Sequence, residues 1–130
     1  MCIFFGTLPI VRNMPDKTPS VPVRFYRTAQ GNEPVLEWLR ALDRRDRQMI
    51  GTDLMRVQIG WPIGMPLVRS LGNGLWEIRS SLTGNRIARL ILCFHQRTLV
   101  VLHGFIKKTR KTPADDLKLA VSRMNEVKRS

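Results

Sequence analysis

Three apolar segments joined by short turns limit most strongly what this chain can fold into. They cover residues 75–80, 86–96 and 99–106, and the residues between them are the turn formers Thr83-Gly-Asn85 and Gln96-Arg-Thr98. Turns this short join antiparallel neighbours. The first segment alternates apolar and polar side chains, whereas the second is apolar on both faces, as a central strand is. These residues therefore predict a run of antiparallel strands.

Helical patterns lie on both sides of these strands in the sequence. Residues 35–42 place apolar side chains at helical spacing, and Asp43 is expected to cap a second helix that ends at Gly60-Trp-Pro62. Two short helices with a tight join predict a helical hairpin. Thr112-Pro113-Ala-Asp115 has the residue types of an N-cap, a first turn and a stabilising carboxylate, and it predicts a C-terminal helix.

Two further strands complete the predicted order. Residues 23–27 alternate apolar with basic or polar side chains, and residues 67–71 add a possible edge strand. The order is then β-α-α-β-β-β-β-α. It predicts an α+β domain with a twisted, mainly antiparallel sheet of four to five strands, an N-terminal helical hairpin and a C-terminal helix.

Residues 1–22 have the composition of a tail. Four prolines interrupt them and no apolar period continues between the prolines, so we expect a flexible segment before a single domain over residues 23–130. Met14 is then as plausible a start as Met1. The two cysteines, Cys2 and Cys93, suggest neither a disulfide framework nor a zinc site. This use of cysteine fits a reducing cytoplasm, where we expect the protein. No apolar run reaches membrane length, and we expect no membrane partner.

The positive charge is concentrated in the predicted sheet. The chain has a net charge of +12, and residues 65–112 contain nine lysines and arginines but only one acid, Glu77. At the end of this region the apolar strand Leu99–Ile106 runs directly into Lys107, Lys108, Arg110 and Lys111. A strand holds the side chains at its end in fixed positions, so these cations predict a site for a polyanion.

Three motifs in this order resemble the RelE/ParE superfamily of toxins from bacterial toxin–antitoxin pairs, and more specifically its phage-derived, HigB-like branch. The motifs are Leu75-Trp-Glu-Ile-Arg79, Arg86-Ile-Ala-Arg89-Leu-Ile-Leu, and Leu102-His-Gly-Phe-Ile-Lys-Lys-Thr-Arg-Lys-Thr-Pro113 followed by a helix. The resemblance covers roughly residues 22–128 and implies a RelE-like fold.

The resemblance also implies a function and a set of site residues. Ribonuclease members of the superfamily cut messenger RNA in the ribosome, need no metal or other cofactor, and use a cluster of basic residues on the sheet. Carried over by position, the catalytic residues are Arg79, Arg89, Lys107 and Lys108. The residues expected to bind substrate are Arg86, Arg110 and Lys111. The implied partners are mRNA on the ribosome and a cognate antitoxin, a small helix-turn-helix protein.

Metal-free RNA cleavage through the 2′-hydroxyl needs a base, an acid and cations that stabilise the charged phosphorane. Arginine supplies a permanent charge, and a lysine crowded by cations can transfer protons. Relatives add a Tyr, or a His and an Asp, near the C-terminus, but no Tyr or His follows Lys111 here. His103 fits either a general base or a core histidine with its hydrogen bonds satisfied.

Other roles for the arginines also stay open. Arg79 can pair with Glu77, its neighbour on the same strand face, and an enclosed Arg89 can pair with an internal acid instead of phosphate. Trp76 points to the opposite face from Arg79 and is expected in the core. At the level of function, the same fold also permits a ParE-like inhibitor of DNA gyrase, or a domain that binds nucleic acid without catalysis.

Overall fold

One mixed sheet organises the structure, a computed structural model that describes residues 20–107 and 111–129. The strand order is β1-β5-β4-β3-β2; β1 runs parallel to β5 and the other pairs are antiparallel. The strands are β1 (Val23–Phe25), β2 (Val68–Gly72), β3 (Leu75–Ser81), β4 (Ile87–His95) and β5 (Thr98–Lys107). The predicted α+β class and mainly antiparallel sheet are confirmed, and the predicted edge strand is β2.

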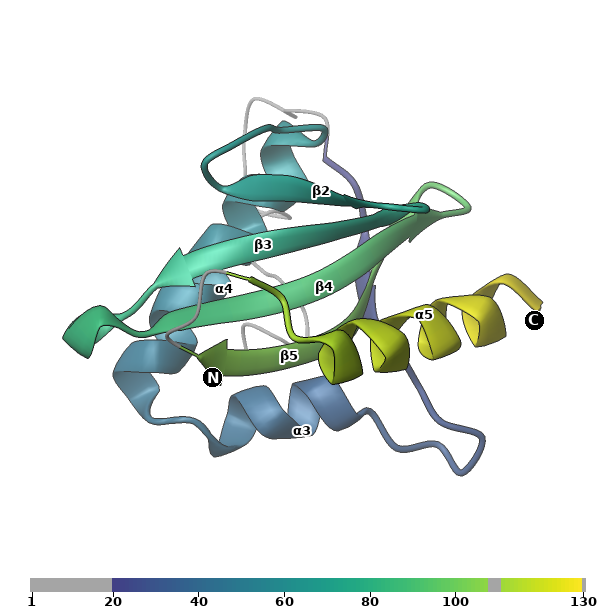
Figure 1. The fold of residues 1–130 in the computed structure, drawn as a ribbon, viewed down its shortest axis with the longest axis horizontal. Helices are drawn as coiled ribbons and strands as arrows, with labels where there is room; N and C mark the ends of the chain where they lie inside the picture. The colour runs from purple at the N-terminus through teal and green to yellow at the C-terminus, as the bar shows by residue number, and fades with distance from the viewer. Residues whose placement is uncertain (1–19, 108–110, 130) are drawn as a thin grey trace.

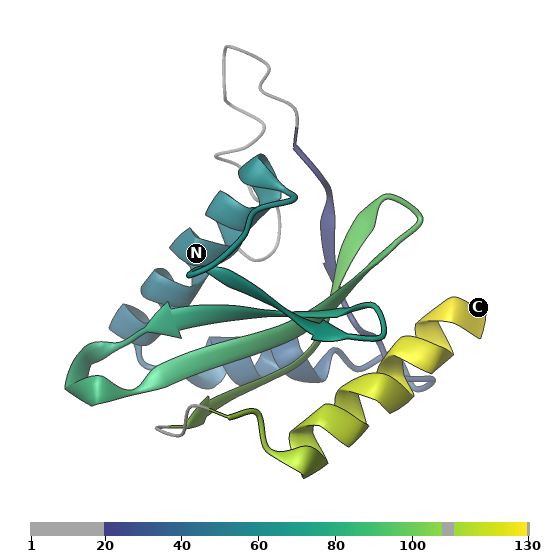
Figure 2. The ribbon, with the colours of Figure 1, turned by 45° about the horizontal axis from the view of Figure 1, so that its top comes forward.

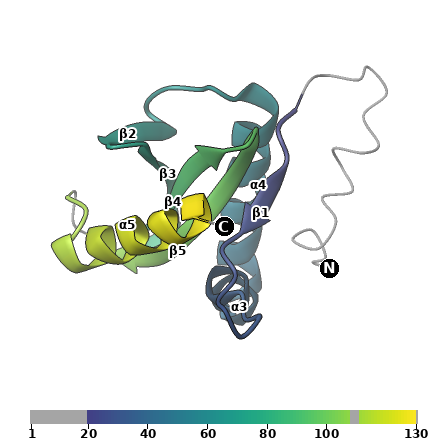
Figure 3. The same cartoon turned by 90° about the vertical axis from the view of Figure 1, so that its right-hand side faces the viewer.

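Helices cover both faces of this sheet (Figures 1 and 3). The helical hairpin α3 (Pro34–Ala41) and α4 (Arg44–Gly60) packs on one face, and α5 (Ala114–Arg129) packs on the other. Figure 2 shows the sheet between the two helical layers, and α5 contacts β4 and β5. None of the described helices combines the length and apolar character needed to cross a membrane.

Local sequence explains the hairpin and the tight turn. Asp43 caps α4 as predicted, because its carboxylate accepts a hydrogen bond from the Arg45 backbone N–H. The apolar side chains Ile50, Leu54 and Val57 of α4 face the sheet and are buried. Gln96 and Arg97 both have positive φ, so they form the type of two-residue turn that suits the twist of antiparallel strands β4 and β5.

Two apolar clusters hold the layers together, one on each face of the sheet. The α3–α4 side contains Leu39, Ile50, Leu54, Ile78 and other residues with almost no exposed surface. On the α5 side the cluster includes Cys93, whose burial raises the pKa of its thiol. We refer to this second surface of the sheet as the α5 face.

The ends of the domain differ in detail from the sequence expectation. Helix α5 begins at Ala114, and the Thr112 hydroxyl, predicted as its cap, instead donates to Glu77 on β3. Val21 and Pro22, assigned to the tail, already form backbone hydrogen bonds with α4 and β5. The rest of the predicted tail, residues 1–19, lies outside the described residues.

Candidate functional site

A buried acid lies at the centre of the α5 face. Glu77 is fully buried, and its Oε2 accepts a 2.6 Å hydrogen bond from the Thr112 hydroxyl. Arg69 Nη2 lies 3.4 Å from Glu77 Oε1, and Arg89 Nη1 lies 3.8 Å from Glu77 Oε2. The four residues come from β2, β3, β4 and the segment before α5. Glu77 therefore ties three strands to the start of the last helix.

Arg89 belongs to this buried network. It has no exposed surface, so the structure matches the alternative in which an enclosed arginine pairs with an internal acid. Burial lowers the pKa of the Arg89 guanidinium, the Glu77 carboxylate raises it, and the cations of Arg79 and Arg69 lower it further. The buried positive charge of Arg89 can attract an anion bound on this face through its electrostatic field, without contacting the anion.

Arg79 occupies a different environment on the same face. It is paired in register with Arg89, and its side chain is partly exposed. The alternative in which Arg79 pairs with Glu77 does not hold, because Glu77 is engaged by Arg69 and Arg89. Among the described residues, the Arg79 guanidinium has no hydrogen-bond or ion-pair partner. It is therefore available to an anion from outside the chain.

A histidine and a carboxylate meet where β5 passes the first turn of α5. His103 Nε2 lies 2.6 Å from Asp116 Oδ1, and both side chains are 17% exposed. Lys107, at the end of β5, contacts the other oxygen of the same carboxylate at 3.4 Å and lies over the Phe105 ring. His103 is therefore neither a buried core residue nor isolated: it is half of a partly accessible His–Asp pair beside a lysine.

The strand register relates this pair to the arginines. His103 pairs with Ile91 and Phe105 pairs with Arg89, so His103 and Arg89 occupy the same face of neighbouring strands. Arg79 follows on the next strand, opposite Arg89. The α5 face thus brings together Arg79, Arg89, His103 and Lys107, which the sequence spreads over 29 positions.

The residues expected to bind substrate are less concentrated. Arg86 forms a bidentate ion pair with Asp46 of α4, with contacts of 2.8 and 2.9 Å, so its guanidinium is committed to holding the helix against β4. Lys111 is exposed just before α5. Lys108, a predicted catalytic residue, and Arg110 lie outside the described residues.

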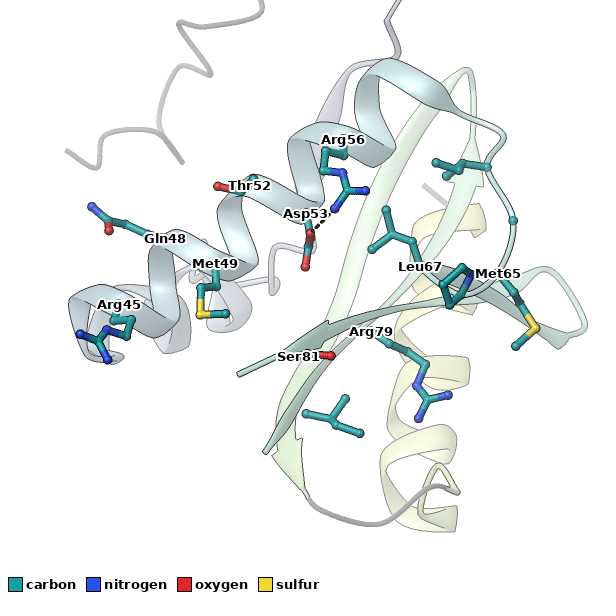
Figure 4. A pocket seen from close by; sticks show the side chains of 14 residues that line it. Arg45, Gln48, Met49, Thr52, Asp53, Arg56, Met65, Leu67, Arg79 and Ser81 are labelled. Atoms are coloured by element: carbon teal, nitrogen blue, oxygen red, sulfur yellow. Dashed lines mark hydrogen bonds and ion pairs between the residues drawn. The ribbon is translucent and has the colours of Figure 1, made fainter. Parts of the chain in front are cut away.

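An open groove of about 810 Å³ borders the α5 face at Arg79 (Figure 4). It lies between α4, the segment after α4 and the ends of β3 and β4. Its lining combines apolar side chains with three arginines and one acid. The charged members are Arg45, Asp53, Arg56 and Arg79, and the apolar side chains are Met49, Ile63, Met65, Pro66, Leu67 and Ile87.

Three residues of the site were not predicted from the sequence. Asp116, Thr112 and Arg69 join the site through tertiary contacts, and their only signals were an acidic first turn of the last helix and a strand with one arginine. Nothing local says that Asp116 faces His103 while Asp115 is exposed. Trp76 does point away from Arg79, and it meets Trp61 edge to face at 5.2 Å on the other side of the sheet.

Metal ligands are not grouped in this site. Within the described residues, His, Cys, Asp and Glu side chains nowhere form a cluster of three or more that could hold a metal ion. The groups of this site that could take part in a reaction are therefore cationic side chains, the His103 imidazole and carboxylates.

Comparison with known proteins agrees with this architecture. No curated protein matches the chain at a significant level. Residues 37–125 match the family model described as phage-derived protein Gp49-like, which covers most of the helical hairpin, all strands but β1, and most of α5. The chain therefore belongs to the phage-derived Gp49-like family, a RelE-like family of toxin–antitoxin systems.

Proposed function

We propose that this protein is the toxin of a toxin–antitoxin pair and that it cleaves mRNA on the ribosome without a metal ion. The observation that carries the proposal is the His103–Asp116 pair, with its 2.6 Å contact, beside Lys107 and on the face that carries Arg79. This arrangement offers proton transfer and cationic stabilisation together. A surface that binds nucleic acid without cutting it needs only the cations.

Asp116 prepares His103 for proton transfer. An ionised carboxylate only accepts hydrogen bonds, so the Nε2–H of a neutral His103 donates to Asp116 and the lone pair is left on Nδ1. Nδ1 then takes the proton from a ribose 2′-hydroxyl, whose oxygen attacks the adjacent phosphorus. The bond to the 5′-oxygen breaks, that oxygen receives a proton from Lys107, and the products are a 2′,3′-cyclic phosphate and a 5′-hydroxyl.

The arginines stabilise the charge that develops during this attack. Arg79 offers a planar fork of N–H donors to the phosphorane oxygens. Arg89, buried beneath the same face, adds positive potential, and the predicted catalytic residue Lys108 follows Lys107 in the chain. Of the other residues expected to bind the RNA backbone, Lys111 is exposed just before α5, and Arg110 precedes it in the chain.

The finer assignments are part of the same proposal. We place the protein in the HigB-like branch, in the cytoplasm, with mRNA on the ribosome as substrate and a small helix-turn-helix antitoxin as partner. The family match and the basic sheet support this assignment.

Brief induction without an antitoxin, followed by primer extension on cellular mRNA, tests the proposal. We expect growth arrest and cuts phased with codons in translated messages. His103→Ala and Asp116→Asn should reduce the cuts sharply, whereas Arg97→Ala, a change in the exposed β4–β5 turn, should not. Intact transcripts at good expression of a folded protein would refute the ribonuclease assignment.

A ParE-like gyrase inhibitor is the second candidate. The burial of Arg89 against Glu77 favours it, because one of the four predicted catalytic cations then serves the fold. Intact mRNA together with an induced DNA-damage response would identify this alternative in the same experiment.

A further inference from the structure

Asp116 lies in a part of α5 that the apolar core holds only weakly. The first buried residue of the helix is Ala120, one turn after Asp116. Before it, Leu117 is only partly buried, and Ala114 and Asp115 are exposed. The ends of helices fray unless other contacts hold them. The position of the Asp116 carboxylate therefore depends on a contact outside the apolar core.

Thr112 supplies such a contact. It lies two residues before the start of α5, and its hydroxyl donates a 2.6 Å hydrogen bond to Glu77 Oε2. The same hydroxyl oxygen lies 3.4 Å from Arg69 Nη2, which donates to it. Glu77 has no exposed surface and lies on β3, which is paired on both sides. Because hydrogen bonds to ionised carboxylates are short and strong, Thr112 is joined firmly to a group that the sheet holds in place.

The chain between Thr112 and Asp116 leaves little freedom of movement. The ring of Pro113 fixes its φ angle. Its carbonyl oxygen accepts a 3.1 Å hydrogen bond from the Leu117 N–H, which closes the first turn of the helix. Thr112 and Asp116 are four positions apart, which corresponds to about one helical turn. A displacement of Thr112 is therefore transmitted to the Asp116 carboxylate.

The start of α5 is thus attached to the sheet at two points. Asp116 Oδ1 lies 2.6 Å from His103 Nε2 on β5, and Thr112 is bonded to Glu77 on β3. Strand β4 separates β5 from β3, so the two attachments lie on different parts of the α5 face. With both contacts formed, the first turn of α5 cannot slide along the sheet without breaking one of them.

We propose that Thr112 is a positioning residue, whose hydrogen bond to Glu77 places the Asp116 carboxylate against His103. Without this hydroxyl the start of α5 leaves the sheet more often, and the His103 ring then loses its carboxylate partner. Thr112 acts through Asp116 and not on the RNA. The inference rests on the proposed function only for the use of the His–Asp pair, because the contact itself can be observed without RNA.

The Nε2–H proton of His103 reports on the pair in the absence of any activity. The chain has two histidines, so His95→Gln assigns their NMR signals. We expect the proton held by Asp116 to exchange slowly with water in the ¹⁵N-labelled full chain. Thr112→Val should accelerate the exchange about fivefold, the factor that one ordinary hydrogen bond supplies, and Thr112→Ser, which keeps the hydroxyl, should not. Thr52→Val makes the same change at an exposed position of α4 and is the control.

Cleavage by the same variants tests the consequence for the proposed reaction. Thr112→Val should lower the rate of mRNA cleavage at saturating ribosomes about fivefold, and Thr112→Ser should restore it. The ribosome concentration that gives half the maximal rate should stay unchanged, because no RNA contact is removed. Combined with Asp116→Asn, Thr112→Val should cause no further loss, since the hydroxyl acts through that carboxylate. Losses that simply add in the double variant would contradict the inference.

Two NMR results would also overturn it: unchanged exchange of the His103 proton in folded Thr112→Val, or a Thr112→Ser protein that behaves like Thr112→Val. If Thr112→Val does not fold, Thr112→Ala removes the hydroxyl with a smaller side chain and is measured in the same way. If Thr112 controls the exchange but the chain cuts no RNA, only the proposed function fails. If the chain cuts RNA, and Thr112→Val matches the wild type in exchange and in cleavage, only this inference fails.

Discussion

Glu77 shows how one residue can decide the role of its neighbours. It is the single acid among residues 65–112, and the structure places it fully buried between two arginines and Thr112. A buried carboxylate needs such partners, since desolvation otherwise removes its charge. The same contacts withdraw Arg89 from solvent and leave Arg79 to face an anion.

Replacing Glu77 should therefore destabilise the fold more than replacing Arg69, its partly exposed partner. Glu77→Gln leaves Arg89 buried without its carboxylate, and the expected loss in the free energy of unfolding is about 3–5 kcal/mol. Arg69→Ala, at a side chain that is 32% exposed, should cost clearly less. Urea unfolding of the three proteins measures the difference, and equal losses would mean that the pair with Arg89 is unimportant.

Arg79 should matter for activity and not for stability. Arg79→Ala removes one donor that stabilises the phosphorane, so cleavage should fall by about 10²–10³-fold while the unfolding midpoint changes little. Arg97→Ala, in the exposed turn between β4 and β5, is the control and should retain full cleavage. A folded Arg79→Ala protein with wild-type cleavage would remove this residue from the site.

At the scale of elements, the contact between α3 and β5 depends on a glycine. A Cβ at Gly104 would lie 2.7 Å from Trp38 Cζ3, closer than real Cβ contacts come, and a tight 3.0 Å from a Leu90 side-chain carbon. The missing Cβ thereby allows Trp38 to pack closely on the strand that carries His103.

Gly104→Ala should separate these elements. Overpacking of this kind costs about 1–3 kcal/mol, so we expect a lower free energy of unfolding, measured by urea denaturation. Gly64→Ala is the matched control, because nothing lies within 4 Å of the added Cβ and no positive φ opposes it. Equal stability of both variants and the wild type would show that α3 adjusts without cost.

The ion pair between α4 and β4 predicts a pH dependence. The hydrogen bonds from Arg86 hold the pKa of Asp46 below its ordinary value of 3.8, despite burial, which acts in the opposite direction. The folded state thus binds this proton less readily than the unfolded state. The pair contributes stability above the ordinary pKa, and this contribution is lost as pH falls through the lowered value.

Asp46→Asn should accordingly flatten the acid side of the stability profile. Between about pH 6 and pH 3 the wild type should lose more of its free energy of unfolding than the variant does. Urea titrations at each pH measure both curves. Parallel curves would show that the ionisation of Asp46 does not support the fold.

At the scale of the whole molecule, the two faces of the sheet have different roles: one forms the main apolar core and the other carries the charged residues of the site. One face is covered by the helical hairpin and forms the larger apolar cluster. The other carries the charged residues, and α5 covers part of it while supplying Asp116 (Figure 1). A single sheet therefore provides both the core and the surface on which reactive side chains are held.

Cleavage by the whole protein should survive chelation. The proposed chemistry uses His103, Lys107 and Arg79, and the described residues contain no group of three or more metal ligands. The protein is first dialysed to strip transition metals, and EDTA is then added with enough Mg²⁺ retained to keep the ribosomes intact. We expect the rate of mRNA cleavage on these ribosomes to stay unchanged. Loss of cleavage that zinc or manganese restores would contradict the mechanism.

The local pattern of residues determined the elements and their order. Alternation and apolar runs predicted β3, β4 and β5, the capping role of Asp43 was visible in its position, and the turn at Gln96 and Arg97 followed from the short connection. These features are set by neighbours in the chain, because helical and strand periods and turn geometry involve only a few residues. Placing arginines near the end of β3 and the start of β4 also needed no tertiary information.

Only the tertiary structure decided which side chains meet. Asp46 reaches Arg86 across 40 positions, Glu77 meets Thr112 across 35, and His103 finds Asp116 on another element. Such pairs depend on strand register and on how a helix is rotated against the sheet. A shift of one residue moves a strand side chain to the opposite face and turns a helix side chain by about 100°. That is why the sequence predicted a cationic site, whereas only the fold showed that Arg89 is buried in it and that Arg79 is partly exposed.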